Sequence, residues 1–257
     1  MSASEVPAGL APAEILPRYV LSLARGEPDL RAAQRLRHQV FVEEGAACLD
    51  SPLPGHDDDG FDEHCDHLLA REVGTGTLAA TSRLLPPRGA AAAGRLVAEA
   101  DFDLCGHTWF HGDLVEISRA CLHPDHRGGV LVPLMTLGVA RYALRSGCAW
   151  IGGNCLVPLG EHGEVAAAVW QMVSPQHLAP EEYRVRARRP LRPEGVTAPP
   201  TPSLIPPLVR GALSLGAWVC SDLGYSPRFR TAALYLLMSM RRADPAQLRH
   251  LPGLSGP

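Results

Sequence analysis

The segment from Leu114 to Arg145 constrains the fold of this chain most strongly, because it predicts a strand, a glycine-rich turn and a helix in direct succession. The turn ends in Arg127-Gly128-Gly129-Val130, and an apolar helical run follows it. A helix N-terminus offers unpaired backbone N–H groups and the positive end of a dipole. Glycines let a phosphate oxygen approach those groups closely. The segment therefore predicts a phosphate site, with a plain turn before a helix as the alternative.

The rest of the chain predicts further strands and helices without strict alternation. A helix is expected from Asp29, as its N-cap, through Glu44, with Gly45 ending it. The other expected segments are an acidic loop at 48–62, strands at 67–71 and 77–85, a flexible connection at 86–94, a strand at 114–122, a short strand at 149–151, a helix at 165–173, and closing strands at 217–220 and 233–240. This pattern predicts an α/β fold with a mixed central sheet flanked by helices.

Composition and length predict an N-terminal tail followed by a single folded domain. Residues 1–17 are rich in alanine and proline, and we expect a flexible N-terminal tail there. Residues 18–257 are long enough to form a single domain around one core. Within that domain the Arg/Pro-rich stretch 184–207 is expected to be a surface excursion.

All 24 basic residues are arginine, and the chain contains no lysine. The absence of lysine excludes a Walker A phosphate loop, a Schiff-base enzyme and a lysine general base. A formal net charge of -3 gives no general attraction for nucleic acid, so no nucleic-acid partner is expected.

Seven cysteines without any CxxC spacing indicate reduced thiols, and the N-terminus lacks the basic region of a signal peptide. We therefore expect a cytoplasmic protein. His64, Cys65 and His67 match no standard zinc spacing, so no metal site is expected. Cys121 on the strand before the turn is expected to pack rather than to act as a nucleophile.

Five blocks in register resemble the ornithine acyl-carrier-protein N-acyltransferases, which are members of the acetyltransferase (GNAT) superfamily. The blocks are Arg37–Glu44, Phe61–Leu69, Gly76–Pro86, Val115–Gly129 and Pro206–Cys220. The first four are also similar to the acyl-homoserine-lactone synthases. The resemblance covers roughly residues 31–241. It implies an acyltransferase fold and transfer of a fatty acyl or 3-hydroxyacyl group from acyl carrier protein to the α-amine of ornithine, as the first step of ornithine-lipid synthesis.

The resemblance also implies roles for individual residues. Glu116 is the expected base for the attacking amine, with a structural strand carboxylate as the alternative. Arg83, Arg119 and Arg37 are expected to clamp the carboxylate of an amino-acid acceptor, or else to form internal salt bridges. Arg119 lies three residues after Glu116 and would face the other side of an ideal strand, unless a bulge at this point breaks the parity.

The donor is expected to be an acyl-phosphopantetheine co-substrate, carried by acyl carrier protein or by coenzyme A. Its pantetheine arm should follow the strand edge, and its phosphate should lie on the turn. The residues expected to contact the donor are Ala120, Cys121, Leu122, His123, Arg127, Gly128, Gly129 and Val130. The superfamily often uses a tyrosine to protonate the leaving thiolate, and the sequence does not identify one here.

Two clusters of charged residues could either bind a ligand or partner, or simply be solvated. Asp62 and Asp66, with Phe41, are expected at the acceptor site, where a carboxylate would hold the cationic tail of ornithine. Asp57, Asp58 and Asp59 are expected to form a solvated loop. The five arginines between Arg184 and Arg192 would dock either acyl carrier protein or the anionic inner membrane surface, or else form a solvated loop.

Three other functions fit the same blocks. An acetyl-CoA-dependent small-molecule N-acetyltransferase and an acyl-homoserine-lactone-type synthase are the enzymatic alternatives. The third is a protein that binds an acyl carrier without turnover. Glu116, Arg83 and Arg119 together favour turnover.

Overall fold

The computed structural model describes residues 18–45, 47–106, 112–127, 129–192 and 199–241. Its centre is a mixed sheet with the strand order β1-β2-β3-β5-β6-β10-β8, and β9 also pairs with β10. The strands of this sheet are β1 (Tyr19–Leu23), β2 (Asp66–Glu72), β3 (Leu78–Leu85), β5 (Leu114–Leu122), β6 (Trp150–Val157), β8 (Trp218–Val219), β9 (Gly224–Ser226) and β10 (Thr231–Ser239). The predicted α/β fold with a mixed sheet is confirmed, and the expected tail 1–17 lies outside the described residues.

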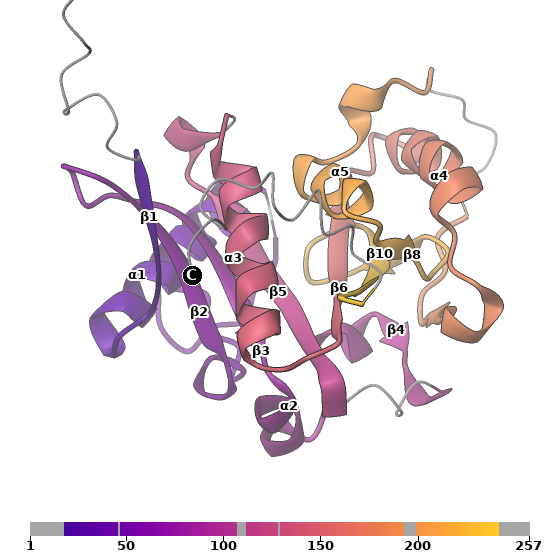
Figure 1. The fold of residues 1–257 in the computed structure, drawn as a ribbon. Coiled ribbons are helices and arrows are strands. Elements are labelled where there is room, and N and C mark those ends of the chain that lie inside the picture. Colours follow the sequence, from indigo (N-terminus) through magenta and orange to yellow (C-terminus); the bar gives the residue numbers. More distant parts are fainter. Residues whose placement is uncertain (1–17, 46, 107–111, 128, 193–198, 242–257) are drawn as a thin grey trace, which may run out of the picture.

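Helices cover both faces of the sheet (Figure 1). The long helices are α1 (Glu27–His38), α3 (Leu131–Arg145) and α4 (Glu164–His177), and the shorter ones are α2 (Pro87–Ala93) and α5 (Pro207–Ser214). On one face Leu131 and Met135 of α3 pack against Leu68 and Val115. On the other face Leu36 of α1 packs against Leu69 and Cys121.

β5 and β6 run parallel but pair at only three positions, of which Glu116 and Gly152 are the last (Figure 1). Beyond that pair the two strands separate, while β6 stays paired with β10 along its whole length. Next to this last pair Gly153 still touches β5, because a Cβ there would lie 2.2 Å from the carbonyl oxygen of Ile117. Pairing between β5 and β6 ends at Glu116, and the sheet is splayed between the two strands beyond this point.

A β-bulge lies just beyond the start of this splay. The register between β3 and β5 shifts between Thr81, which faces Cys121, and Arg83, which faces Ser118. Arg119 takes up the extra residue with a positive φ of 54°. As a result the side chain of Arg119 lies on the same sheet face as Glu116.

Helix α1 continues into a π-helix, η2 (Gln39–Glu44), which ends at Gly45 as predicted. The helix begins differently from the prediction, because Gly26 is the N-cap and Asp29 lies in the first turn. There the Asp29 carboxylate accepts a hydrogen bond of 2.8 Å from the backbone N–H of Arg25. The prediction of Asp29 as the N-cap is therefore wrong.

Two segments are more regular than the sequence suggested. The expected flexible connection at 86–94 contains α2, which has a proline in its first turn and Gly94 in a left-handed conformation at its end. Its alanine run has high helix propensity, so the prediction of flexibility was wrong. The described part of the Arg/Pro-rich stretch is also tied to the body of the protein: β7 (Arg186–Ala187) pairs with β4 (Phe102–Asp103), and the N–H of Leu191 donates to Leu223.

Candidate active site

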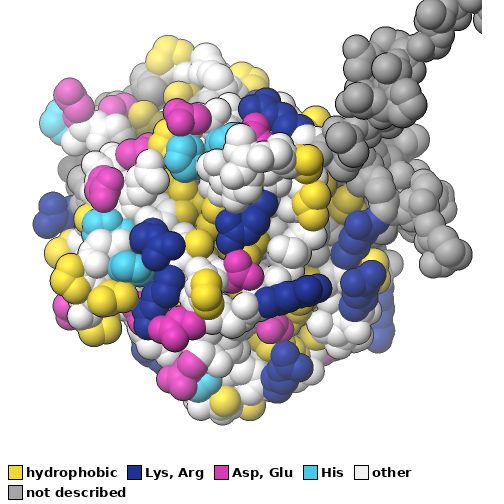
Figure 2. All heavy atoms as spheres, turned by 90° about the vertical axis from the view of Figure 1, so that its left-hand side faces the viewer, with side chains coloured by type: hydrophobic (Ala, Val, Ile, Leu, Met, Phe, Trp, Pro, Cys, Tyr) yellow, Lys and Arg dark blue, Asp and Glu magenta, His cyan; other side chains and the backbone are white. Residues whose placement is uncertain are grey.

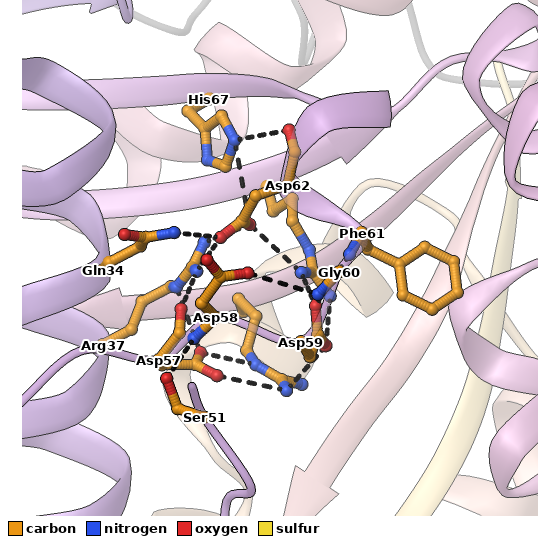
Figure 3. A network of polar contacts seen from close by, with 12 residues as sticks. Gln34, Arg37, Ser51, Asp57, Asp58, Asp59, Gly60, Phe61, Asp62 and His67 are labelled. Atoms are coloured by element: carbon orange, nitrogen blue, oxygen red, sulfur yellow. Dashed lines mark hydrogen bonds and ion pairs between the residues drawn. The ribbon is translucent and has the colours of Figure 1, made fainter. Parts of the chain in front are cut away.

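A cluster of six buried charged residues lies on the sheet face covered by α1, and Figure 3 shows most of it. We call it the buried ion-pair cluster; it consists of Arg37, Asp57, Asp59, Asp62, Arg83 and Arg119. Four segments supply these residues: α1, the loop before β2, β3 and β5. Three arginines balance three aspartates, so the cluster has no formal net charge.

Arg37 is the link between the loop and α1. Its side chain is completely buried, and its Nε lies 3.0 Å from Asp57 Oδ2. Its two terminal nitrogens donate to both oxygens of Asp62, at 2.9 and 2.6 Å. The amide nitrogen of Gln34, one turn earlier, donates to the same carboxylate at 2.7 Å. Asp62 is thus fully occupied by partners within the protein.

Arg83 and Arg119 link the same loop to β3 and β5. Arg83 donates to both oxygens of Asp59, and its Nε donates to Ser118 Oγ at 2.9 Å. Arg119 donates from Nε to Asp57 Oδ2 at 2.7 Å and from Nη2 to Asp59 Oδ2 at 2.9 Å. Asp57 and Asp59 were expected to be solvated, and that expectation is wrong because three buried guanidinium groups require carboxylate partners.

The cluster keeps its carboxylates ionised. Burial alone would raise the pKa of Asp62, but the hydrogen bonds and charge of Arg37 outweigh burial and lower that pKa to about 2. In the same way Arg83 and Arg119 lower the pKa of Asp59 well below its usual value against the effect of burial. Removing one partner from such a buried network typically costs about 3–5 kcal/mol, because a charge is left uncompensated.

Glu116 lies on the same face, at the base of the splay, and is 1% exposed. Its carboxylate oxygens accept hydrogen bonds from the backbone N–H groups of Val97 at 2.6 Å and Ala98 at 2.7 Å. These two residues begin the 3-10 helix η4 (Val97–Ala100). Burial raises the pKa of Glu116 to about 7, although the two hydrogen bonds oppose the rise. A carboxyl with this pKa can take up and release a proton near neutral pH.

Two aromatic rings lie beside Arg119. The guanidinium carbon of Arg119 lies 4.8 Å from the ring centre of Phe229, and this ring meets Phe41 of η2 edge-on at 5.4 Å. Arg228, the residue before Phe229, is half exposed and donates to Asp59 at 3.1 Å. Phe41 therefore lies in the same neighbourhood as Arg119.

Asp66 lies apart from the buried ion-pair cluster. Its carboxylate accepts hydrogen bonds from Tyr142 of α3 and from Arg88, so it points toward the opposite face of the sheet. Both Asp66 and Asp62 line a cavity of about 380 Å³ at the N-terminal end of α1, together with Ala24, Gly26, Glu27, Leu30, Cys65 and His67. Of the two aspartates, only Asp66 has a partly exposed carboxylate.

The residues expected at the donor follow β5 to its end. Ala120, Cys121 and Leu122 are the last residues of β5, and His123 is the N-cap of the short 3-10 helix η6 (Pro124–His126) that precedes the turn. Burial raises the pKa of the Cys121 thiol to about 12, so the thiol stays protonated and packs against α1, which agrees with the expectation that it is no nucleophile.

The turn itself leads into α3. Gly129 has a φ of 60° and open space where a Cβ would lie, and Val130 is the N-cap of α3 and is 57% exposed. Arg127 donates to Glu44 of the π-helix. Gly128, the remaining residue of the turn, lies outside the described residues.

Surface arginines fall into two groups. On the side that carries β1 and α1, dark blue and magenta side chains are interspersed in Figure 2, and the ion pairs Arg18–Glu72, Arg31–Glu27 and Arg71–Asp29 lie in this region. In contrast, the exposed arginines at 184, 186, 188, 189 and 192 form no ion pair within the described part of the chain.

Within the described ranges no group of three or more acidic, histidine or cysteine side chains is placed to hold a metal ion. No helix in those ranges combines the length and the apolar composition needed to cross a bilayer.

Comparisons with known proteins agree with this fold. Residues 36–136 match the family model described as an acetyltransferase (GNAT) domain. At 17% identity the fold is similar to that of a CoA-dependent acyl-homoserine lactone synthase, BjaI with MTA, with a TM-score of 0.50 over 86% of this chain and 79% of that one. At 11% identity it is similar to that of FeeM, an N-acyl amino acid synthase from uncultured soil microbes, with a TM-score of 0.53 over 88% of this chain and 94% of that one.

Similarity in sequence is closer to two curated bacterial enzymes. The L-ornithine N(alpha)-acyltransferase of Rhodobacter capsulatus is 34% identical over 86% of this chain and 89% of its own length. The enzyme of the same name from Agrobacterium fabrum is 28% identical over 84% of this chain and 79% of its own length. The chain therefore belongs to the L-ornithine N(alpha)-acyltransferase family of acyltransferases.

Proposed function

We propose that this protein transfers a fatty acyl or 3-hydroxyacyl group from the phosphopantetheine thioester of acyl carrier protein to the α-amine of L-ornithine. The product is an amide, which would serve as the first intermediate of an ornithine lipid. The choice of acceptor is supported by the relatives, because four of them, from four bacteria, are named L-ornithine N(alpha)-acyltransferase.

The observation that carries the proposal is the position of Glu116. Its carboxylate is buried at the base of the β5–β6 splay and has a pKa of about 7. An amine attacks a thioester only as the neutral base, so a proton must leave the nitrogen during the reaction. In this proposal Glu116 accepts that proton, directly or through one water molecule.

The acceptor would bind with its carboxylate toward the arginine side of the site. Arg83 and Arg37 are completely buried and each pairs with two aspartates, so they position the loop rather than touch the substrate. Arg119 and the half-exposed Arg228 have donors left over and are the proposed clamp. This clamp would place the α-amine, rather than the distant side-chain amine, next to the thioester.

The side-chain ammonium of ornithine requires a separate anionic partner. Asp66 lines the cavity at the start of α1 and is the proposed partner, for which its carboxylate would turn from Tyr142 and Arg88 into that cavity. Asp62 would support the cavity wall. Reference pKa values of about 8 for an α-amino group and about 10.4 for a lysine-like amine also favour acylation of the α-amine, which is the easier one to neutralise.

The donor would enter from the open end of the splay. Its pantetheine arm would follow the free edge of β5 from Ala120 to His123, and its phosphate would lie on the N–H groups of the turn at Gly128, Gly129 and Val130. Arg127 would add a positive charge at that point. The unpaired arginines between Arg184 and Arg192 would attract an acidic carrier protein, and contact with an anionic inner membrane surface is a second use of the same charge.

The test is product analysis with the purified chain. Incubation with L-ornithine and an acyl carrier protein that bears a 3-hydroxyacyl group should give one new product, and fragmentation in the mass spectrometer should place the acyl group on the α-nitrogen. Acylation of the side-chain nitrogen would contradict the proposed clamp. Transfer of acetyl from acetyl-CoA with no transfer of the long chain would contradict the proposed donor.

A further inference from the structure

The leaving thiolate requires a proton, and the residues described so far supply none. When the amine nitrogen bonds to the thioester carbon, the C–S bond breaks and its electron pair stays on sulfur. Glu116 receives the proton from nitrogen. A second group that is already protonated must therefore face the sulfur atom.

Tyr235 of β10 is a buried hydroxyl without a partner at this place. Its side chain is 0% exposed, and its Oη has no hydrogen-bond partner among the described residues. Buried hydroxyl groups are almost always hydrogen-bonded, so an orphan one indicates a missing ligand or water. It is held by packing alone, in the cluster that contains Phe102, Leu114 and Leu237.

The position of that hydroxyl follows from the sheet register. Tyr235 lies opposite Asn154, and its side chain reaches back along β6 to Gly152. A Cβ built on Gly152 would lie 2.8 Å from Tyr235 Oη, so the hydroxyl occupies the space that glycine leaves empty. Gly152 is the partner of Glu116 in the last pair before the splay. The hydroxyl therefore lies beside Glu116, at the base of the splay.

Two further observations fit a proton donor. Burial, and next to it the charge of Glu116, raises the pKa of Tyr235 well above its usual value, so the hydroxyl stays protonated throughout the neutral range. In addition the opposite residue, Asn154, has a buried side-chain oxygen without a hydrogen-bond partner in the described part of the chain. Two unsatisfied polar atoms on facing residues indicate that this part of β6 and β10 meets a polar group that the protein does not supply.

We propose that Tyr235 is the proton donor to the leaving thiolate, and that Glu116 returns the proton afterwards. The inference rests on the proposed function, because it assigns a group to the thioester sulfur. The amine proton passes to Glu116, the Tyr235 proton passes to sulfur, and the tyrosinate regains its proton from Glu116. The net change is amide plus thiol, and both side chains end as they began.

The first test is Tyr235→Phe, which removes one oxygen and keeps the ring packed. We expect turnover with an alkyl thioester donor to fall by about 10²-fold, the lower end of the usual range for general acid catalysis, because a thiolate is a moderately good leaving group. The melting temperature should stay the same or rise, because the lost hydroxyl made no hydrogen bond. Tyr225→Phe, on the neighbouring strand β9, is the matched control and should leave turnover unchanged.

The second test varies the leaving group. A thiophenyl ester leaves as a weakly basic thiolate that hardly needs a proton, so Tyr235→Phe should lose less than about 5-fold with it. Gly152→Ala places a methyl group against Oη and should reproduce the same dependence on the leaving group. Equal losses with alkyl and aryl thioesters, or normal turnover of Tyr235→Phe, would overturn the inference while wild-type activity upholds the proposed function. A wild-type chain that forms no amide would overturn both.

Discussion

The protein shifts the pKa values of its buried carboxyl groups in opposite directions. Asp59 and Asp62 are surrounded by guanidinium groups, which hold their pKa values low. The stability that these ionised groups contribute is therefore present above their unfolded pKa of 3.8. It is lost as the pH falls, through about 2 for Asp62. Glu116 has a raised pKa, so its contribution is fully present below 4.5 and is lost as the pH rises through about 7. The protein thus retains an ionisable group at the splay at a cost in stability near neutral pH.

Replacing Glu116 by glutamine keeps the shape of the side chain and removes the base. We expect turnover to fall by about 10²–10⁴-fold, with donor binding retained. In the wild type kcat/KM should rise with pH through about 7, because the ionised carboxylate is the active form. In the variant the rise of kcat/KM around pH 7 should disappear. Any remaining rise at higher pH should follow the fraction of the amine that is neutral.

Glu99→Gln is the matched control for this change. Glu99 caps the same 3-10 helix through the backbone N–H of Leu96. Its loss should lower stability and, because the charge of Glu99 adds to the raised pKa of Glu116, should move the rise of kcat/KM to lower pH without abolishing it. If Glu116→Gln has near-normal turnover and only a lower melting temperature, Glu116 is a structural strand carboxylate.

At the scale of elements, the sequence was informative where the signal was local. The strand Leu114–Leu122 has the predicted bounds, and the bulge named as the exception to the parity between Glu116 and Arg119 is present. The fate of Asp57 and Asp59 was missed because it depends on arginines that lie 20 to 62 residues away along the chain. A count of the buried-looking arginines would have revealed the need for carboxylates. Tyr235 could not be recognised at all, because its position depends on the β10–β6 register.

The turn before α3 gives a prediction at this scale. Gly129→Asp should weaken donor binding, because a carboxylate would point at the phosphate, and the site has room for the side chain. Gly129→Asn is the matched control: asparagine tolerates the same positive φ and adds nearly the same volume without charge. Titration with an acyl-phosphopantetheine thioester should show a loss for aspartate of at least 10-fold relative to asparagine. Equal donor affinities for the Asp and Asn variants would contradict phosphate binding at this turn.

At the scale of the whole molecule, charge is distributed unevenly even though the net charge is only -3. The side with β1 and α1 carries arginines that pair with acidic neighbours (Figure 2). The stretch from Arg184 to Arg192 carries unpaired ones in the described structure. If these arginines attract an acidic partner, as proposed, that attraction should be sensitive to ionic strength.

Comparison of two donors at rising salt tests that expectation. Turnover with acyl carrier protein should fall steeply between low and physiological ionic strength, while turnover with the free pantetheine thioester should change little. Replacing Arg186 and Arg189 by glutamine should lower turnover with acyl carrier protein and spare turnover with the free thioester. Arg18→Gln, next to β1 at the other edge of the sheet, should affect neither rate. Equal salt sensitivity for both donors would contradict docking at this stretch.

The buried ion-pair cluster has a consequence for how this molecule can be divided. Its members come from residues 37 to 119, and each guanidinium depends on a carboxylate from the loop between α1 and β2. A fragment that ends before β5 would bury Asp57 and Asp59 without Arg119, and one that begins after α1 would leave Asp62 without Arg37. Neither piece could balance its own charge in the interior. During synthesis we therefore expect the polar centre to close only after β5 has left the ribosome, and the segment before β5 to be less stable alone than in the whole chain.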